Sequence, residues 1–301
     1  MDGILALWKE RGMTSHDCVF KLRKILKTKK VGHTGTLDPG VEGVLPICIG
    51  QATRIAEYLT DAGKTYEAVV SIGRTTTTED AEGETVEANN DFKSYTRAQI
   101  LAALATLTGE IEQTPPMFSA VKVNGKKLYE YARAGQTVER PTRKVTIYDL
   151  QLLSEEEQFE GEEVRFSIRI ACSKGTYIRT LAVQIGEALG MPAHMYELVR
   201  TKSGTFNEGN CLTLAQVAEK MESGDTSFLL PVEYALSNYP QLAIDASIAK
   251  KVINGQQLPA HPLLAEHDKI VYMKDGKAFA IYKAHPEKPG MMKLDKMFPN
   301  V

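Results

Sequence analysis

A carboxylate on a glycine-rich loop is the clearest candidate for chemistry in this sequence. Asp38 precedes Pro39 and Gly40, and apolar residues flank this turn at Leu37 and at 44–47. Asp-Pro-Gly by itself is most often only a turn. A carboxylate held by proline and by apolar anchors can, however, serve as a general base or as a nucleophile. It then needs a nearby cation to stay ionised, because burial raises the pKa of a carboxyl group.

A cationic partner for Asp38 has to come from a distant part of the chain. Arg179 follows a turn at Gly175 and is the candidate. Without further observations, an ordinary surface ion pair is the commoner role for such an arginine.

The spacing of other reactive side chains excludes several enzyme classes. The six histidines form neither an H-x-H nor an H-E-x-x-H pattern, so no metal site is expected. No G-K-[ST] follows the glycines of residues 32–40 at the offset of a phosphate-binding P-loop, and no G-x-S-x-G is present. The four cysteines lie far apart in the sequence and are expected to be reduced structural thiols.

Charge is distributed unevenly along the chain. The 301 residues include 36 Lys and Arg against 38 Asp and Glu, and the net charge of −2 argues by itself against a nucleic-acid partner. Residues 18–37 nevertheless carry no carboxylate and six bases: Lys21, Arg23, Lys24, Lys27, Lys29 and Lys30. The compensating acid stands elsewhere, in runs at 79–91 and 155–163. The basic run is either a solvated helix face or a strip that binds phosphates beside the loop.

Periodicity and capping signals predict the elements that position these residues. Alternating side chains predict strands at 66–72 and 164–170. Residues 31–50 are expected to form a shaped loop that enters a buried strand, and residues 269–283 a hairpin around Asp275-Gly276. Helices are predicted after caps or turns at Ser15, Thr96 (with Gln99), Gly175, Thr213 (with Gln216) and Asp245. Beyond about residue 238 the pattern changes to that of short strands, and we interpret this change as a domain boundary.

Five motifs follow one another along the chain in a characteristic order. They are GHTGTLDP at 32–39 with its continuation to residue 53, KTYE at 64–67, QTPPMFSA at 113–120, KGTYIRTL at 174–181, and LVRT at 198–201. Together they closely resemble the TruB family, the tRNA pseudouridine-55 synthases. The resemblance covers about residues 1–237, and the remainder is similar to a shortened PUA-type RNA-binding domain. One departure is Glu42, a second carboxylate where small or hydroxylic residues are expected.

The resemblance implies isomerisation of one uridine in the T loop of tRNA, without cofactor or metal. Asp38 matches the essential aspartate, which acts at the ribose by attack at C1′ or by proton abstraction at C2′. Tyr66 matches the tyrosine that stacks on the target base, although a core role in its strand is the alternative. Arg179 matches the arginine paired with the aspartate. Further substrate contacts are expected at His33, Thr36, Lys64, Tyr177, Leu198, Arg200, Lys29 and Lys30.

The family also implies an architecture and a setting. We expect an α/β (α+β) fold with a central mixed, largely antiparallel sheet flanked by helices. Residues 1–237 would form the catalytic domain and residues 238–301 a small β-rich PUA-like domain. The expected partner is the T stem-loop of tRNA, and the protein is expected to be a cytoplasmic monomer. Two alternatives stay open: a non-catalytic RNA-binding protein or tRNA-folding chaperone, and a metal-dependent hydrolase built on His33 and Asp38.

Overall fold

Local capping signals set where several helices begin in the computed structural model, which describes residues 1–298. Reciprocal capping boxes start α3 (Arg97–Thr106) at Thr96 and α6 (Leu214–Glu222) at Thr213, and Asp245 caps α8 (Ala246–Ile253). These three predicted caps are confirmed.

The predicted cap of α1 (Ser15–Ile25) is wrong by one residue. Thr14 is the cap, and its hydroxyl accepts a hydrogen bond from the amide of Asp17. Ser15 is buried instead, where its hydroxyl accepts a bond of 2.9 Å from the amide of Leu37. The side chain that would have capped the helix therefore anchors the glycine-rich loop.

The main sheet has nine strands and is mixed but largely antiparallel, as predicted. Its order is β1-β3-β14-β4-β13-β11-β8, with β2 paired to β3 and β15 to β14. Only β3 and β14 pair in parallel, through Glu42 and Gly43 opposite Val199 and Arg200. The strands are β1 (Gly3–Lys9), β2 (Val31–His33), β3 (Glu42–Ile49), β4 (Lys64–Ile72), β8 (Gly109–Gln113), β11 (Arg143–Leu152), β13 (Val164–Cys172), β14 (Ala193–Ser203) and β15 (Phe206–Asn207).

Smaller elements decorate this sheet. Two-stranded ribbons are formed by β5 (Arg74–Thr76) with β6 (Thr85–Ala88), β7 (Lys93–Thr96) with β12 (Gln158–Gly161), and β9 (Lys122–Val123) with β10 (Lys126–Lys127). The remaining helices of this part are η1 (Gly50–Ile55), α2 (Ala56–Asp61), α4 (Leu128–Arg133), α5 (Ile178–Ala188), η2 (Glu208–Asn210) and α7 (Val232–Ala235).

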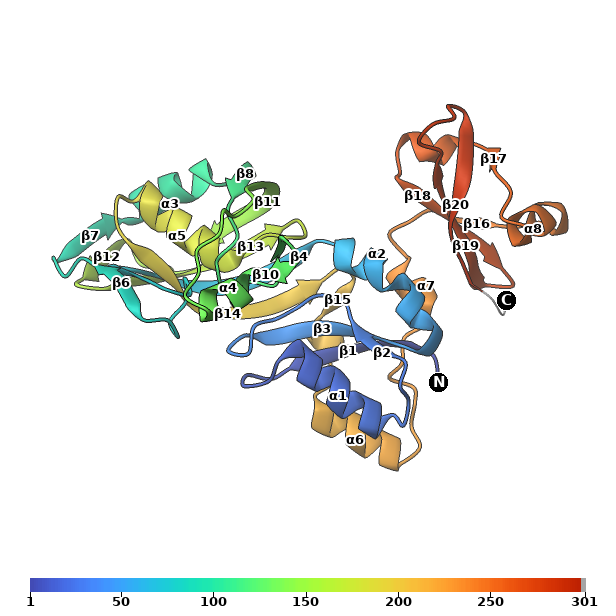
Figure 1. The fold of residues 1–301 in the computed structure, drawn as a ribbon, viewed down its shortest axis with the longest axis horizontal. Helices are drawn as coiled ribbons and strands as arrows, with labels where there is room; N and C mark the ends of the chain where they lie inside the picture. Colours follow the sequence, from blue (N-terminus) through green and yellow to red (C-terminus); the bar gives the residue numbers. More distant parts are fainter. Residues whose placement is uncertain (299–301) are drawn as a thin grey trace.

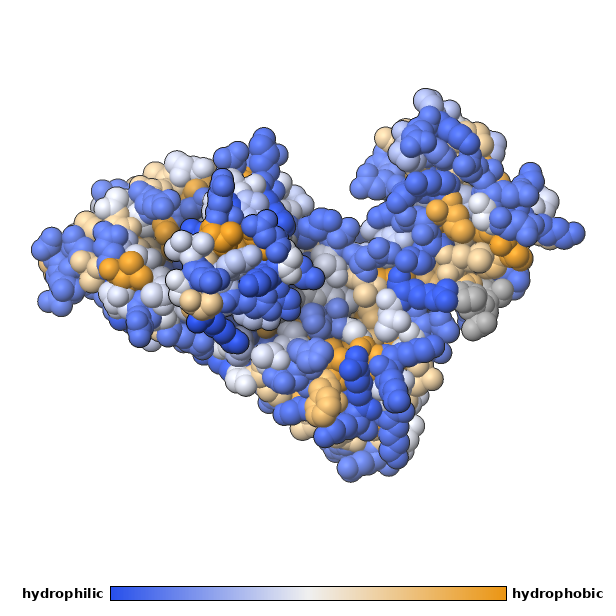
Figure 2. All heavy atoms as spheres, viewed as in Figure 1, coloured by the Kyte–Doolittle hydropathy of each residue, from blue (hydrophilic) through white to orange (hydrophobic). Residues whose placement is uncertain are grey.

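Two pairs of helices pack on the main sheet over different strands (Figure 1). The pair α1 and α6 lies beside β1 and β2, whereas α3 and α5 lie against β11 and β14. Side chains of both pairs, such as Leu22 and Ile185, belong to one continuous core with the strands between them. Figure 2 shows the surface hollowed where these two parts meet. The parallel junction of β3 and β14 lies between the two helix pairs.

The C-terminal residues form a separate β-rich unit. Its sheet has the order β16-β18-β19-β20-β17, and the predicted hairpin turns at Asp275 and Gly276, which both have positive φ. The unit projects away from α3 and α5 (Figure 1) and packs on α2, β1 and β3. Its elements are β16 (Gln241–Ala243), α8, β17 (Leu258–Pro259), η3 (Pro262–Ala265), β18 (Lys269–Lys274), β19 (Lys277–Ala284) and β20 (Met291–Met297).

Two further observations concern the whole described chain. All four cysteines are unpaired, in agreement with the expectation of structural thiols. Among residues 1–298, no helix has the length and apolar character needed to cross a membrane.

Candidate active site

Buried residues anchor the loop between β2 and β3, and the carboxylate of Asp38 on this loop stays partly exposed. Thr34 is buried and donates from its hydroxyl to the carbonyl of Pro46 at 3.0 Å. Leu37 is buried against the core, and the amide of Val41 closes a turn on the carbonyl of Asp38 at 3.1 Å. The side chain of Asp38 is 44% exposed. The predicted loop thus anchors a half-exposed carboxylate at a fixed position.

A glycine makes the close approach of β3 and β14 possible. A Cβ built on Gly43 would lie 2.3 Å from the carbonyl oxygen of Arg200, and the φ of Gly43 is +126°. Only glycine adopts this conformation without strain and leaves room for the neighbouring backbone. The parallel junction therefore depends on this position, and it brings Leu198 and Arg200 beside the loop.

Asp38 forms an ion pair with Arg179, as the family resemblance implies. Asp38 Oδ2 lies 3.0 Å from Arg179 Nη2. Arg179 is in the first turn of α5 and is only 5% exposed. Its two terminal nitrogens also donate at 2.9 Å each to the carbonyls of Thr78 and Phe118. The backbone carbonyls of Thr78 and Phe118, from two distant parts of the chain, therefore fix the guanidinium that pairs with Asp38.

The acidic run at 79–91, distant from the loop in the sequence, lies beside it in the fold. Asp80 Oδ2 lies 3.8 Å from Arg179 Nη1. Glu79 accepts a hydrogen bond of 2.7 Å from the hydroxyl of Thr180, and burial raises the pKa of this carboxyl group. A Cβ on Gly40 would fall 2.3 Å from Glu82 Oε1. The turn between β5 and β6 thus carries three carboxylates to the edge of the candidate site.

Tyr66 lies on β4, next to the parallel junction, with Arg200 as its partner on β14. It is 7% exposed. Burial raises the pKa of its phenol, and the guanidinium of Arg200 opposes that rise. Tyr66 is therefore a protonated, largely buried aromatic side chain near the Asp38 loop.

Among the residues that the structure describes, two cations beside the loop, Arg200 and Lys64, have no carboxylate partner. Arg200 is 1% exposed and donates from Nε to the carbonyl of Val44 at 2.8 Å, while its Nη2 makes no hydrogen bond of normal geometry with any described residue. The ammonium of Lys64 donates to the carbonyls of Thr60 and Ala62 at 2.9 and 2.8 Å. Burial lowers the pKa of Lys64 to about 8. Uncompensated positive charge of this kind favours an anionic ligand.

The other candidate residues surround this centre. His33 is half-buried, and its Nδ1 accepts a hydrogen bond from the amide of Gly35 at 3.4 Å. Burial lowers the pKa of His33, and the neighbouring His16 and Arg200 lower it further. Tyr177 directly precedes α5, and Gln113 bonds both polar groups of its backbone. Leu198 is buried, whereas Thr36, Lys29 and Lys30 are exposed at the loop and its approach.

Sequence reasoning missed a lysine under the loop. Lys9 is fully buried and donates to the carbonyls of Glu10 and Pro39, at 3.0 and 3.4 Å. It forms no ion pair with any described residue, and burial lowers its pKa. The available signal was a lysine at the end of the apolar run 3–8, a position that a strand places next to the loop.

Sequence reasoning also missed a basic and aromatic segment between β8 and β11. Lys126, Lys127 and Arg133 lie over the rings of Tyr129 and Tyr131, with charge-to-ring distances of 5.3 to 5.8 Å. The segment reaches the centre, because the carbonyl of Phe118 binds Arg179. The interleaving of bases and aromatics at 126–133 was visible in the sequence and is typical of nucleic-acid contacts.

Glu42, the carboxylate that departs from the family pattern, has a cationic partner. Glu42 is paired with Arg11, whose Nε lies 3.4 Å from Glu42 Oε1, so the extra carboxylate is partly neutralised. Within residues 1–298, no three His, Cys, Asp or Glu side chains are grouped so that they could hold a metal ion.

Comparisons with known proteins agree with this geometry. The model of the TruB family pseudouridylate synthase N-terminal domain matches residues 23–178, and that of the tRNA pseudouridylate synthase B C-terminal domain matches residues 179–237. The tRNA pseudouridine synthase B of Listeria innocua is 57% identical over 99% of this chain and 98% of its own length. That of Geobacillus thermodenitrificans is 56% identical, over 99% of this chain and 100% of its own.

Solved structures point to the same family. A chain of a Cbf5-Nop10-Gar1 complex superposes with a TM-score of 0.72 at 30% identity, covering 98% of this chain and 84% of that chain. A chain of an H/ACA RNP bound to a substrate RNA containing 2′-deoxyuridine gives a TM-score of 0.71 at 28% identity, with the same coverage. The family models, the relatives and the arrangement around Asp38 all lead to one conclusion: this chain belongs to the TruB family of pseudouridylate synthases.

Proposed function

We propose that this protein isomerises the uridine at position 55 in the T stem-loop of tRNA to pseudouridine. The observation that carries the proposal is the ion pair of Asp38 with the buried Arg179, beside Tyr66 and two cations, Lys64 and Arg200, that have no carboxylate partner among residues 1–298. Close relatives over the full chain are tRNA pseudouridine synthases, and a structural neighbour is bound to a substrate RNA.

The reaction exchanges one bond to the ribose for another. The N1–C1′ bond of the uridine breaks and a C5–C1′ bond forms, after which C5 loses its proton and N1 gains one. Asp38 acts at the ribose, either by attack at C1′ or by removal of a proton from C2′. Arg179 orients this carboxylate, because its guanidinium pairs with Asp38 and is itself fixed by two carbonyls.

The target base has to leave its stack before Asp38 can reach the ribose. Tyr66 offers an aromatic face to the displaced base, and stacking on it recovers roughly 1 to 3 kcal/mol. His33 and Leu198 line the approach to this face, and Tyr177 stands at the start of α5. Because the pKa of Tyr66 is raised, its phenol stays protonated at neutral pH and can donate a proton or a hydrogen bond.

The remaining contacts to RNA are electrostatic. Lys29 and Lys30 meet phosphates at the approach to the loop, and Lys64 and Arg200 supply further positive charge beside Tyr66. Residues 1–237 act as the catalytic domain, and residues 238–301 act as a PUA-like RNA-binding domain. The protein works as a monomer in the cytoplasm and needs neither a cofactor nor a metal.

Release of label from C5 of uridine in a tRNA transcript, with no metal or nucleotide added, tests this function. Wild-type protein releases the label, and Asp38→Asn releases none while it still binds the transcript. An active Asp38→Asn variant contradicts the role of Asp38. Binding without label release by the wild type supports a non-catalytic RNA-binding protein, and hydrolysis of the transcript that a chelator inhibits, without label release, supports the metal-dependent hydrolase.

A further inference from the structure

Two neighbours of the Asp38 loop carry opposite charge. On one side α1 begins against the loop, because Ser15 accepts a hydrogen bond from the amide of Leu37. On the other side the turn between β5 and β6 brings the carboxylates of Asp80 and Glu82 to the edge of the site. Since like charges repel, a phosphate backbone that leaves the site passes more favourably over α1 than over this turn.

The exposed face of α1 combines cations with an aromatic ring. Phe20 is 55% exposed, and the ammonium of Lys24 lies 4.5 Å from the centre of its ring. Exposed side chains recur every four residues from the start of the helix, and they form a line that extends about 12 Å away from the loop. Together with the lysine that follows the end of the helix, we call this line the α1 stripe: His16, Phe20, Lys24 and Lys27.

The positive charge of the α1 stripe is not neutralised within the part of the chain that the structure describes. Lys24 and Lys27 form no ion pair with any residue from 1 to 298. The nearest carboxylate in the sequence, Asp17, accepts hydrogen bonds from the backbone and hydroxyl of Thr14. The charge on this face of α1 is therefore free to attract an anionic ligand.

Lys27 holds this charge on a backbone that usually belongs to glycine. It directly follows Leu26, the last residue of the helix cap, and its φ is +50°. A side chain is strained in this region, and helices commonly place glycine at this position. Strain of this kind often accompanies a functional role, although a cation here also interacts favourably with the helix dipole.

We propose that the α1 stripe binds the RNA stem that closes the loop with the target uridine, with Lys24 and Lys27 at its phosphates and Phe20 against its riboses. This inference rests on the proposed function, because the uridine has to reach Asp38. A base-paired RNA stem presents phosphates along both strands and a wide, shallow minor groove with exposed riboses. A line of cations around one apolar ring is complementary to that surface.

Two stem-loop RNAs, one with a full stem and one cut to the base pairs next to the loop, separate contacts to the stem from contacts to the loop. The wild type is expected to bind the full stem more tightly. Phe20→Ala weakens this binding several-fold without changing its salt dependence, because the ring carries no charge. Lys24→Ala also weakens it and lowers the slope of log K against log salt by up to about 0.9. Affinity for the short stem stays at the wild-type value in both variants.

Lys27→Gly separates a role in binding from a role in folding. Glycine relieves the positive φ, so the midpoint of urea denaturation is expected to stay the same or to rise. Affinity for the full stem falls in the same variant, and its salt dependence becomes flatter. Unchanged affinity for the full stem in Phe20→Ala, Lys24→Ala and Lys27→Gly overturns the inference, and so does an equal loss with both RNAs.

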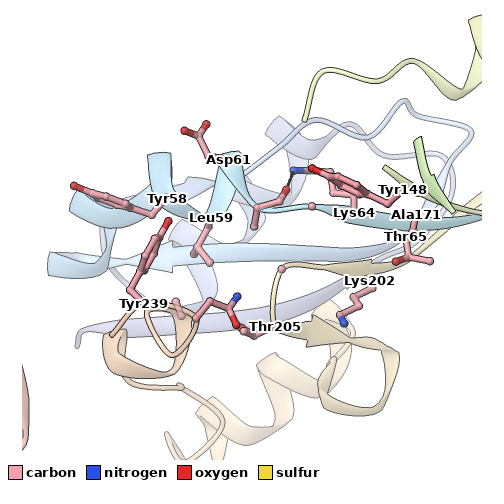
Figure 3. Close-up of a pocket in the computed structure, with 15 residues that line it drawn as sticks. Tyr58, Leu59, Asp61, Lys64, Thr65, Tyr148, Ala171, Lys202, Thr205 and Tyr239 are labelled. Carbon is pink, nitrogen blue, oxygen red and sulfur yellow. Dashed lines mark hydrogen bonds between the residues drawn. The ribbon is translucent and has the colours of Figure 1, made fainter. Parts of the chain in front are cut away.

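A lysine on the opposite face of the main sheet provides the matched control. Lys202 lies opposite Thr65 across the strands, and strand alternation places this pair on the other face from Tyr66. Lys202 lines a cavity of about 360 Å³ there (Figure 3) and forms no ion pair with any described residue. Lys202→Ala is therefore expected to keep the wild-type affinity and salt dependence, and a loss equal to that of Lys24→Ala overturns the inference.

Release of label from C5 of the target uridine is measured in parallel with both RNAs. Its absence in the wild type contradicts the proposed function. Release by the wild type, together with α1 variants that bind the full stem as the wild type does, overturns only the role of the α1 stripe.

Discussion

Arg179 is the residue on which the centre depends most. Its guanidinium is bound by Asp38, by two backbone carbonyls and, at longer range, by Asp80. Burying an arginine costs free energy unless its donors are satisfied, and charge-assisted hydrogen bonds are the strongest available. The same bonds fix the orientation of the carboxylate that acts on the ribose. The contacts that satisfy the buried guanidinium of Arg179 are therefore the same contacts that orient Asp38.

Lys64 gives a prediction about pH at the same scale. Burial lowers its pKa in the folded protein to about 8, whereas an unfolded lysine keeps a value near 10.5. Between these two values the unfolded chain binds more protons at this residue, so the contribution of Lys64 to the free energy of unfolding rises with pH.

Comparison with Lys64→Met isolates this contribution from other groups that titrate in the same range. The free energy of unfolding of the wild type, relative to that of the variant, is expected to increase from pH 8 to pH 10. Urea denaturation at several pH values measures it. A difference that stays constant or shrinks over this range contradicts a lowered pKa.

The residues that the sequence could identify are those inside compact motifs. Asp38, Tyr66 and Arg179 each stand in a distinctive run of neighbours. Asp80 and Lys9 do not, and they reach the centre only because a turn and a strand end lie against it in the folded chain. An acidic run is typical of a solvent-exposed segment, and no neighbouring residue in the sequence indicates that Asp80 will lie near Arg179.

At the scale of elements, the close approach of β3 and β14 yields a prediction. Gly43→Ala would place a methyl group 2.3 Å from the carbonyl oxygen of Arg200, on a backbone with positive φ. Strain of both kinds lowers the free energy of unfolding by at least about 2 kcal/mol. Gly32→Ala is the control, because a Cβ there has no neighbour within 4 Å. Equal free energies of unfolding for the two variants in urea would contradict the close approach of β3 and β14 at Gly43.

The approach to the loop gives a second prediction for an element. Lys29 and Lys30 are exposed just before β2, and removing two phosphate contacts reduces the slope of log K against log salt by up to about 1.8. The double variant Lys29→Ala/Lys30→Ala is therefore expected to bind tRNA more weakly, with a flatter salt dependence. Lys144→Ala/Lys220→Ala is a charge-matched control, since both lysines are already paired with carboxylates. Identical slopes for the two double variants would exclude contacts between these two lysines and phosphates.

Elements that depend on short-range signals were predictable, and their arrangement was not. Thr96, Thr213 and Asp245 each cap a helix, because their side chains accept a hydrogen bond from the backbone amide three residues later. The parallel pairing of β3 with β14 joins residues more than 150 positions apart. At α1 two neighbouring hydroxyls could serve as the cap, and the structure uses Thr14 with Asp17, while Ser15 accepts from the amide of Leu37.

At the scale of the molecule, the two sheets share one apolar core. Ile4 and Val44 from the back of the main sheet pack in the same cluster as Val271 and Ile281 from the C-terminal unit. Polar contacts reinforce this contact surface: Tyr58 donates to Asp295 at 2.6 Å, and Lys296 lies 2.8 Å from Glu57. Shared burial of this kind couples the stability of the two parts, so they are expected to unfold together.

Ala278→Glu tests that coupling. Ala278 is 3% exposed in the shared cluster, and its amide donates to the carboxylate of Glu233 at 2.7 Å. A glutamate there buries a charge beside a like charge, which neither part tolerates while they stay in contact. We expect the single calorimetric transition of the wild type to split into two. Lys277→Glu places a glutamate at the exposed neighbouring position, with an even larger change of charge, and keeps one transition. One transition in both variants would mean that the two parts are held together by contacts other than this core.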